Sequence, residues 1–191
     1  MKRIALLYGA NEGPALAWRL TPALREQGYE MTSSLEAADC VITHSGGVLE
    51  LPARLPDKLV LVVVPSTGYN GTLADTMLRK VILDISHAWR QKQMAFWFRK
   101  TAINLFYALN LPRTAKLFIA NRRLGRGLPA CQAAKVAIIV QPRDPWSRDL
   151  PEKTITAHAD YTYITIPGHH DDIWQYPDAY IKLLTKIGEQ Q

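Results

Sequence analysis

Short runs of apolar residues alternate along the chain with longer stretches in which apolar residues recur every three or four positions. The first run, Arg3–Tyr8, predicts a buried strand, and the turn-forming residues Gly9–Gly13 end it. The next stretch predicts a helix with Pro14 in its first turn, because leucines recur every four positions until Gly28 ends the pattern. The chain is therefore expected to begin with a strand, a loop and a helix.

Three more apolar runs follow before residue 65. Tyr29–Ser33 predicts a brief strand and Asp39–Thr43 a stronger one. Lys58–Val64 is continuously apolar and rich in β-branched residues, which is typical of a parallel strand covered on both faces. Between these strands, Val48–Leu55 is expected to begin a helix.

The alternation breaks between about Thr72 and Leu124, where the pattern is helical, basic and aromatic. Pro112 is expected to separate two helices in this stretch. Strands resume at Lys135–Val140 and Tyr161–Ile166, and an amphipathic helix, Asp178–Ile187, closes the chain.

This order of elements predicts an α/β fold with a mostly parallel β-sheet flanked by helices. The length of 191 residues, with 48% hydrophobic and 21% charged residues, suits one packed domain. We expect a single domain, 1–191, in which residues 72–127 form a helical cap inserted between the Lys58–Val64 and Lys135–Val140 strands.

A reducing cytoplasm is the simplest location for the chain. Its two cysteines, Cys40 and Cys131, are too few for a disulfide scaffold and lack a paired metal-binding spacing. The basic start is followed by only about four apolar residues, too few for a signal peptide. The sequence has no run of the roughly 18 apolar residues that a membrane span needs.

Positive charge is concentrated in the cap. Residues Thr76–Arg126 contain eleven lysines and arginines but only one acid, Asp84, whereas the whole chain has a net charge of +6. The remainder is therefore mildly acidic. No recognisable nucleic-acid-binding module accompanies the basic residues, so a specific nucleic-acid partner is not expected.

Thr43–Gly47 (THSGG) lies between a predicted strand and a predicted helix. This is the context of a nucleophile elbow, in which a serine sits on a sharp turn and small neighbours are needed two residues away. Ser45 would be exposed above the sheet, with the amide of Gly46 aimed at a developing oxyanion. A simple turn, or one whose amides cradle a phosphate, is an equally supported interpretation of this motif alone.

Later strand ends supply the groups that a serine nucleophile needs. Because the carboxyl ends of parallel strands meet at one edge of the sheet, residues after the last two strands should lie near Ser45. Asp144 follows Lys135–Val140, and His169 and His170 follow Tyr161–Ile166.

Taken in order, the strand and loop at the start, the THSGG elbow, the cap, the Asp144 strand and the PGHH loop resemble the α/β-hydrolase superfamily, specifically a small serine hydrolase or esterase. The resemblance covers nearly the whole chain. It implies that Ser45 is the nucleophile, Asp144 the orienting acid and His170 the base, with His169 as the alternative base. Asp149, Asp171 and Asp172 are further candidates for the acid.

The resemblance also implies an oxyanion hole. Gly46 would provide one amide, and Ala10 or Asn11, in the loop after the first strand, would provide the second. In the cap, Trp89, Trp97 and Phe98 are candidate substrate contacts.

The His-His-Asp-Asp run at 169–172 also invites a metal-site interpretation. No second ligand cluster and no H-x-x-x-H spacing supports it, so neither a metal nor a cofactor is expected. His44 is expected to pack beneath the elbow, and His87 is expected to be an ordinary surface or helix residue.

Three interpretations of the basic, aromatic cap remain open: a solvated face over packed aromatic residues, a lid for an acidic or acyl-chain substrate, and a peripheral contact with an anionic membrane. The leading functional hypothesis is a serine hydrolase that cleaves a carboxylic ester, thioester or related acyl bond of a small molecule. The alternative is a non-catalytic hydrolase-like protein that uses the cap to bind a partner or an anionic surface. A nucleotide- or sugar-binding transferase is a third class, but the chain lacks G-x-G-x-x-G and P-loop spacings.

Overall fold

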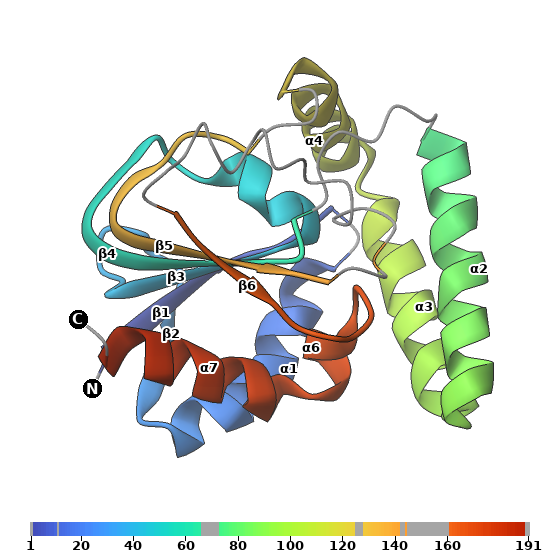
Figure 1. Cartoon of the computed structure of the whole chain (residues 1–191). Helices are drawn as coiled ribbons and strands as arrows, with labels where there is room; N and C mark the ends of the chain where they lie inside the picture. The colour runs from blue at the N-terminus through green and yellow to red at the C-terminus, as the bar shows by residue number, and fades with distance from the viewer. Residues whose placement is uncertain are drawn as a thin grey trace.

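The computed structural model describes residues 2–10, 12–65, 73–124, 128–141, 144 and 161–189. Six strands in these ranges form one sheet in which every neighbouring pair is parallel, with the order β2-β1-β3-β4-β5-β6 (Figure 1). The strands are β1 (Lys2–Leu7), β2 (Tyr29–Thr32), β3 (Cys40–His44), β4 (Arg54–Val63), β5 (Gln132–Val140) and β6 (Tyr161–Thr165). The expected α/β class and parallel sheet are confirmed.

Apolar side chains cover both faces of the sheet. On one face, Ile42, Leu61 and Ile139 pack under α1 (Gly13–Glu26) and α7 (Pro177–Glu189). On the other face, alternate residues of the same strands form a second core with Val48 and Leu51, the latter just beyond η1 (Ser45–Glu50). Burial on both faces is the reason that these strands are almost continuously apolar.

The segment after β3 differs from its sequence-based prediction. Instead of an α-helix over Val48–Leu55, this segment forms a 3₁₀ helix, η1, and returns to extended backbone at Leu51. Pro52 follows directly, and its ring and missing N–H oppose an extension of the helix. β4 consequently begins at Arg54, four residues before the strand that we predicted.

Between β4 and β5 the chain forms three helices: α2 (Leu73–Gln91), α3 (Met94–Ala108) and α4 (Leu111–Leu124). Pro112 lies at a boundary between two helices, as we predicted, since α3 ends at Ala108 and α4 begins at Leu111. It lies in the first turn of α4, where a missing backbone N–H costs nothing. Figure 1 shows α2 and α3 side by side at the end of the sheet where the strands terminate. None of the helices in the described ranges has the length and hydropathy needed to cross a bilayer.

The C-terminal region contains one helix that we did not predict. A single turn, α6 (Asp172–Gln175), follows β6 and precedes α7. Ile173 and Trp174 of α6 are buried, which fixes the loop after β6 onto the core.

Candidate active site

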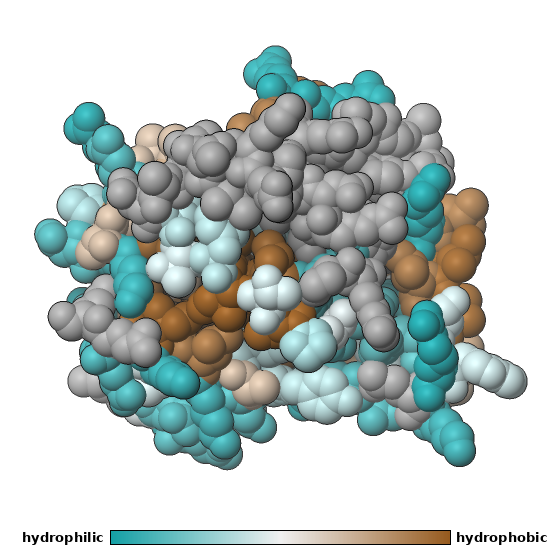
Figure 2. All heavy atoms as spheres, in the orientation of Figure 1, coloured by the Kyte–Doolittle hydropathy of each residue, from teal (hydrophilic) through white to brown (hydrophobic). Residues whose placement is uncertain are grey.

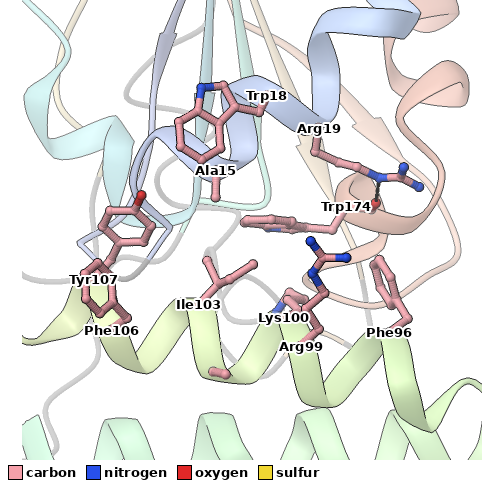
Figure 3. A pocket seen from close by; sticks show the side chains of 11 residues that line it. Ala15, Trp18, Arg19, Phe96, Arg99, Lys100, Ile103, Phe106, Tyr107 and Trp174 are labelled. Atoms are coloured by element: carbon pink, nitrogen blue, oxygen red, sulfur yellow. Dashed lines mark hydrogen bonds between the residues drawn. The ribbon is translucent and has the colours of Figure 1, made fainter.

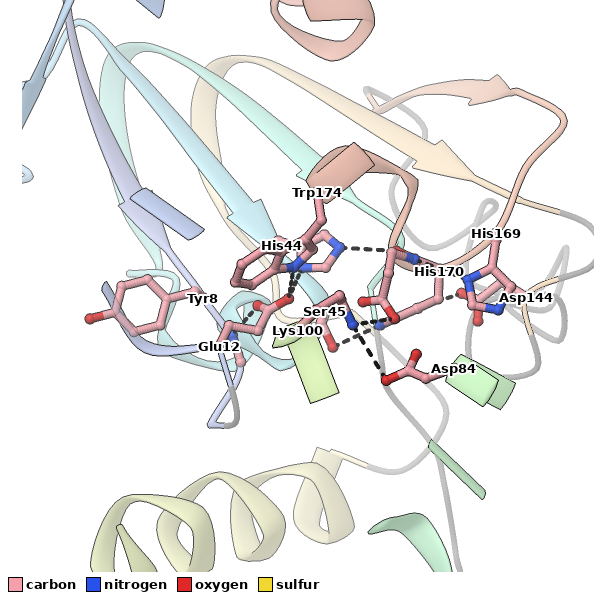
Figure 4. Close-up of polar contacts among 12 residues, drawn as sticks. Tyr8, Glu12, His44, Ser45, Asp84, Lys100, Asp144, His169, His170 and Trp174 are labelled. Atoms are coloured by element: carbon pink, nitrogen blue, oxygen red, sulfur yellow. Dashed lines mark hydrogen bonds and ion pairs between the residues drawn. The ribbon is translucent and has the colours of Figure 1, made fainter. Parts of the chain in front are cut away.

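Three sequence-predicted residues meet at the carboxyl edge of the sheet. Ser45 follows β3, Asp144 follows β5 and His170 follows β6. The Ser45 hydroxyl donates to Nε2 of His170 across 3.0 Å, and Nδ1–H of His170 donates to Oδ2 of Asp144 across 2.9 Å (Figure 4). Asp144 is fully buried and His170 is 3% exposed, so water does not screen this pair.

His169, the alternative base, does not take part in this line of hydrogen bonds. Its ring stacks on the ring of His87, with centroids 4.1 Å apart and an interplanar angle of 29°. The structure therefore places His170, and not His169, beside Ser45.

The backbone at Ser45 has the geometry of a strained turn. Its φ of +52° lies in the left-handed region, which residues other than glycine seldom adopt. Gly47 makes the turn possible, because a Cβ at this position would lie 2.5 Å from the carbonyl carbon of Leu7 and the amide nitrogen of Tyr8. The requirement for a small residue two positions after the serine is thus a close approach between the elbow and the end of β1.

The elbow also adjoins the loop that follows β1. A Cβ on Gly46 would lie 3.7 Å from the Cα of Gly9. Ala10, a candidate oxyanion donor, is half-buried in this loop, and Asn11 lies outside the described residues. Two of the three predicted amide donors are therefore in adjacent segments.

The chain matches no family model and no curated protein at a significant level. It matches solved structures over almost its whole length. One is a carboxylesterase structure from the thaumarchaeon Nitrososphaera gargenis (14% identity, TM-score 0.58, 97% of this chain and 89% of the other). Another is the thioesterase RedJ from the prodiginine pathway of Streptomyces coelicolor (15% identity, TM-score 0.53, 100% and 90%). A third is an alpha/beta hydrolase fold protein from Nakamurella multipartita (13% identity, TM-score 0.53, 93% and 88%).

The chain has the α/β-hydrolase fold. This confirms the fold that we inferred from the order of its strands and motifs.

Within this α/β-hydrolase fold, His44 does more than pack beneath the elbow. It is fully buried, its Nδ1 forms an ion pair with Oε1 of Glu12, and its Nε2–H donates to the carbonyl oxygen of His170 across 3.1 Å (Figure 4). Both ring nitrogens of His44 therefore face oxygen atoms of residues from other loops.

Glu12 is the acidic partner of this second pair and is itself 2% exposed. Its Oε2 accepts the backbone N–H of Gly9 at 2.9 Å, and its Oε1 accepts the indole N–H of Trp174 at 3.3 Å. Burial alone would raise the pKa of this carboxyl. The charge and hydrogen bond of His44, with the Gly9 amide, outweigh burial and lower the pKa of Glu12 to about 2.

A buried lysine joins the three-helix segment to the histidine loop of the α/β-hydrolase fold. Lys100 of α3 is 2% exposed, and its Nζ lies 2.9 Å from Oδ2 of Asp171 and 3.5 Å from Oδ2 of Asp84. It also lies 5.1 Å from the ring centroid of Trp97. Because Asp171 directly follows His170, this ion pair ties α2 and α3 to the proposed catalytic histidine.

Among the residues that the structure describes, two groups of three side chains present potential metal-ligating atoms within 4.8 Å of one another. They are His44, His170 and Asp171, and His87, His169 and Asp172. The histidines of the first group already bind Glu12, Ser45 and Asp144. In the second group, the rings of His87 and His169 stack on one another.

His87 lies on the helix α2, one of the two places that we predicted, but it is buried and not at the surface. It is 8% exposed, and burial lowers its pKa, while burial raises the pKa of Asp172, which lies 3.7 Å away. Both groups are thereby biased toward their neutral forms, as suits a packing contact between α2 and the histidine loop.

The three aromatic residues proposed as substrate contacts have different surroundings. Trp89 and Phe98 are 76% and 58% exposed and face away from the protein interior. Trp97 is buried, makes an edge contact with His87 at 4.6 Å and lies 6.0 Å from the ring of His169. Of the three, only Trp97 lies near the histidine loop.

Proposed function

We propose that the protein is a serine hydrolase that cleaves a carboxylic ester, thioester or related acyl bond of a small molecule. The observation that carries the proposal is the line of hydrogen bonds from Ser45 through His170 to Asp144, built on a strained turn at the sheet edge. A surface serine has no structural need for a φ of +52° together with a buried imidazole–carboxylate pair.

The geometry supports a two-step mechanism. His170 accepts the proton of Ser45 as its Oγ attacks the acyl carbon, and Asp144 stabilises the resulting imidazolium. His170 then returns the proton to the leaving group, which leaves an acyl-enzyme on Ser45. Water, deprotonated by the same histidine, attacks this ester and releases the acid.

Backbone amides would stabilise the oxyanion that forms in each step. We assign one donor to Gly46 and the second to Ala10 or Asn11, because Gly46 and Gly9 lie against one another. In serine hydrolases each such donor is worth roughly 3 kcal/mol of transition-state stabilisation.

The structural neighbours support a hydrolase in general terms, since they include a carboxylesterase and a thioesterase. Because ester and thioester carbonyls pass through similar tetrahedral intermediates, the triad geometry accommodates either. We therefore propose the bond class without narrowing the acyl group.

The second candidate function is a binding protein that uses α2–α4 to contact an anionic membrane. Among the described residues, nine of the twelve exposed large hydrophobic side chains lie on these helices, and in Figure 2 hydrophobic side chains gather at the edge formed by α2. On α2, Leu78, Ile82, Ile85 and Trp89 follow one exposed stripe. Binding to anionic liposomes that weakens steeply with added salt would favour this function.

Labelling with a fluorophosphonate probe distinguishes the two candidates. We expect wild-type protein to be labelled, and Ser45→Ala and His170→Ala to lose labelling. The matched control is His169→Ala, which removes a histidine from the same loop but not from the hydrogen-bonded line. Folded wild-type protein that resists the probe would overturn the hydrolase proposal, and loss of labelling in His169→Ala alone would overturn the choice of base.

A further inference from the structure

A hollow lies between α1 and α3, and Ser45 is not among the residues that line it. Its volume is about 720 Å³, within the roughly 300–1,000 Å³ of small-molecule sites. Its walls are mainly aromatic: Trp18, Phe96, Phe106, Tyr107 and Trp174 (Figure 3). Ile103 points into its centre from α3.

Every charged residue that lines this groove, among those that the structure describes, is basic. They are Arg19, Arg99 and Lys100. Lys100 is neutralised by its ion pair with Asp171. The two arginines are exposed, and Figure 3 shows both heads at the end of the groove that Phe96 forms.

Neither arginine has an acidic partner among the described residues. Arg19 donates from Nε to the carbonyl oxygen of Trp174 at 2.8 Å, and its guanidinium lies 6.0 Å from the ring centroid of Phe96. The first contact orients this side chain without cancelling its charge. The groove thus combines an apolar length with a cationic end.

We infer that this groove binds an amphiphile that has one hydrocarbon chain and a carboxylate head, such as a medium-chain fatty acid. The planar guanidinium groups of Arg19 and Arg99 match a carboxylate, which they can hold through paired hydrogen bonds. The chain would run past Trp174 and Ile103 toward Phe106 and Tyr107.

The inference goes beyond the proposed hydrolase activity and does not depend on it. Trp174 nevertheless links the two sites, because it lines the groove and its indole N–H donates to Glu12. An occupied groove therefore contacts the same residue that supports the Glu12–His44 pair.

The test measures binding to full-length Ser45→Ala protein, so that a failure of the hydrolase proposal cannot affect the result. Decanoate is titrated below its micellar concentration by calorimetry, with tryptophan fluorescence as a second readout because Trp18 and Trp174 line the groove. We expect saturable binding of decanoate, roughly tenfold weaker binding of octanoate because two buried methylenes are lost, and no saturable binding of decyltrimethylammonium.

Two variants locate the site. Arg19→Gln with Arg99→Gln should weaken decanoate binding at least tenfold, whereas the control Arg122→Gln with Arg123→Gln, which removes the same charge from α4, should leave it unchanged. Ile103→Trp should block the groove, and circular dichroism verifies that each variant is folded. Equal affinity for the anionic and the cationic amphiphile would overturn the inference. An equal loss of decanoate affinity in the two double-arginine variants would also overturn it.

Discussion

Glu12 and His44 form a buried ion pair that connects three loops at the carboxyl edge of the sheet. Glu12 binds the backbone of Gly9 in the loop after β1, and His44 holds the carbonyl of His170 in the loop after β6. His44 itself immediately precedes Ser45. The proposed nucleophile, its base and the proposed oxyanion loop are thus held by one acid–histidine pair, next to the pair formed by Asp144 and His170.

Glu12→Gln should lower hydrolysis without abolishing it. The amide side chain retains a carbonyl oxygen for Gly9 but removes the charge beside His44, so the carbonyl of His170 loses a firmly held donor. We expect kcat to fall roughly tenfold to a hundredfold with little change in KM, because small displacements of a catalytic group act on the chemical step. Steady-state kinetics on a p-nitrophenyl ester checks this, with the exposed Glu36→Gln as control. A rise in KM at constant kcat would contradict a positioning role.

The same pair should make folding stability depend on pH. The pKa of Glu12 is about 2 in the folded protein and 4.5 in its ordinary state, so the unfolded chain binds the proton more tightly. This contribution, on the order of 3 kcal/mol, is fully present above pH 4.5 and is lost as the pH falls from 4.5 toward 2. Urea denaturation should show that wild type has a higher free energy of unfolding than Glu12→Gln, and that this difference becomes smaller as the pH falls across this range. A difference in the free energy of unfolding that does not change with pH would contradict this prediction.

Asp144→Asn should leave the protein folded and nearly inactive. The amide retains the size of the buried side chain, but it can no longer stabilise the imidazolium of His170 or fix its Nδ1–H tautomer. The expected loss in kcat is roughly 10³- to 10⁴-fold. Asp149→Asn, at another candidate acid that lies outside the described residues, serves as the control. Activity within tenfold of wild type would exclude Asp144 as the orienting acid.

Gly47→Ala and Gly46→Ala should differ sharply in folding stability, although the two positions are adjacent. A methyl group on Gly47 would collide with the backbone of Leu7, which cannot move without disturbing β1. We therefore expect Gly47→Ala to lower the free energy of unfolding by about 3 kcal/mol or more. The methyl group on Gly46 would meet only an ordinary contact with Gly9. Thermal unfolding of the two variants tests this, and similar melting temperatures would contradict it.

Lys100→Met should destabilise the protein because it leaves two buried carboxylates without their cationic partner. The substitution removes the positive charge beside Asp84 and Asp171, and the loss of one member of a buried ion pair typically costs about 3–5 kcal/mol. The exposed Lys116→Met on α4 is the matched control. Urea denaturation measures both. If Lys100→Met with Asp171→Asn were no more stable than Lys100→Met alone, the ion pair would not be the cause.

The positions of Ser45, Asp144 and His170 could be predicted because they depend on chain order. In a parallel sheet, every residue that directly follows a strand arrives at the same edge, so the strand pattern alone brings these three together. His169 could not be excluded in this way, since adjacent residues share the loop. His169 and His170 differ in the direction of their side chains, and the ring of His169 stacks on His87 instead of facing Ser45.

The roles of Glu12, His44 and Lys100 could not be predicted from the sequence. Each depends on partners far away in the chain, as His44 does on the carbonyl of His170, 126 residues later. The histidine directly before the proposed nucleophile was the one feature of the sequence that pointed to this pair. Its partner, Glu12, could be identified only from the fold. The extent of η1 was missed for a local reason, because the periodicity of Val48–Leu55 concealed the effect of Pro52.

The strand order has a consequence for how the protein would lose activity on heating. β3, which carries Ser45, lies inside the sheet, whereas β6, which leads to His170, lies at its edge and pairs with β5 alone among the described strands. Edge segments open locally at lower free energy than central ones, and amide hydrogen exchange detects such openings. The proposed base would therefore separate from its serine in a reversible opening of β6 and α6, and inactivation would precede melting of the central strands.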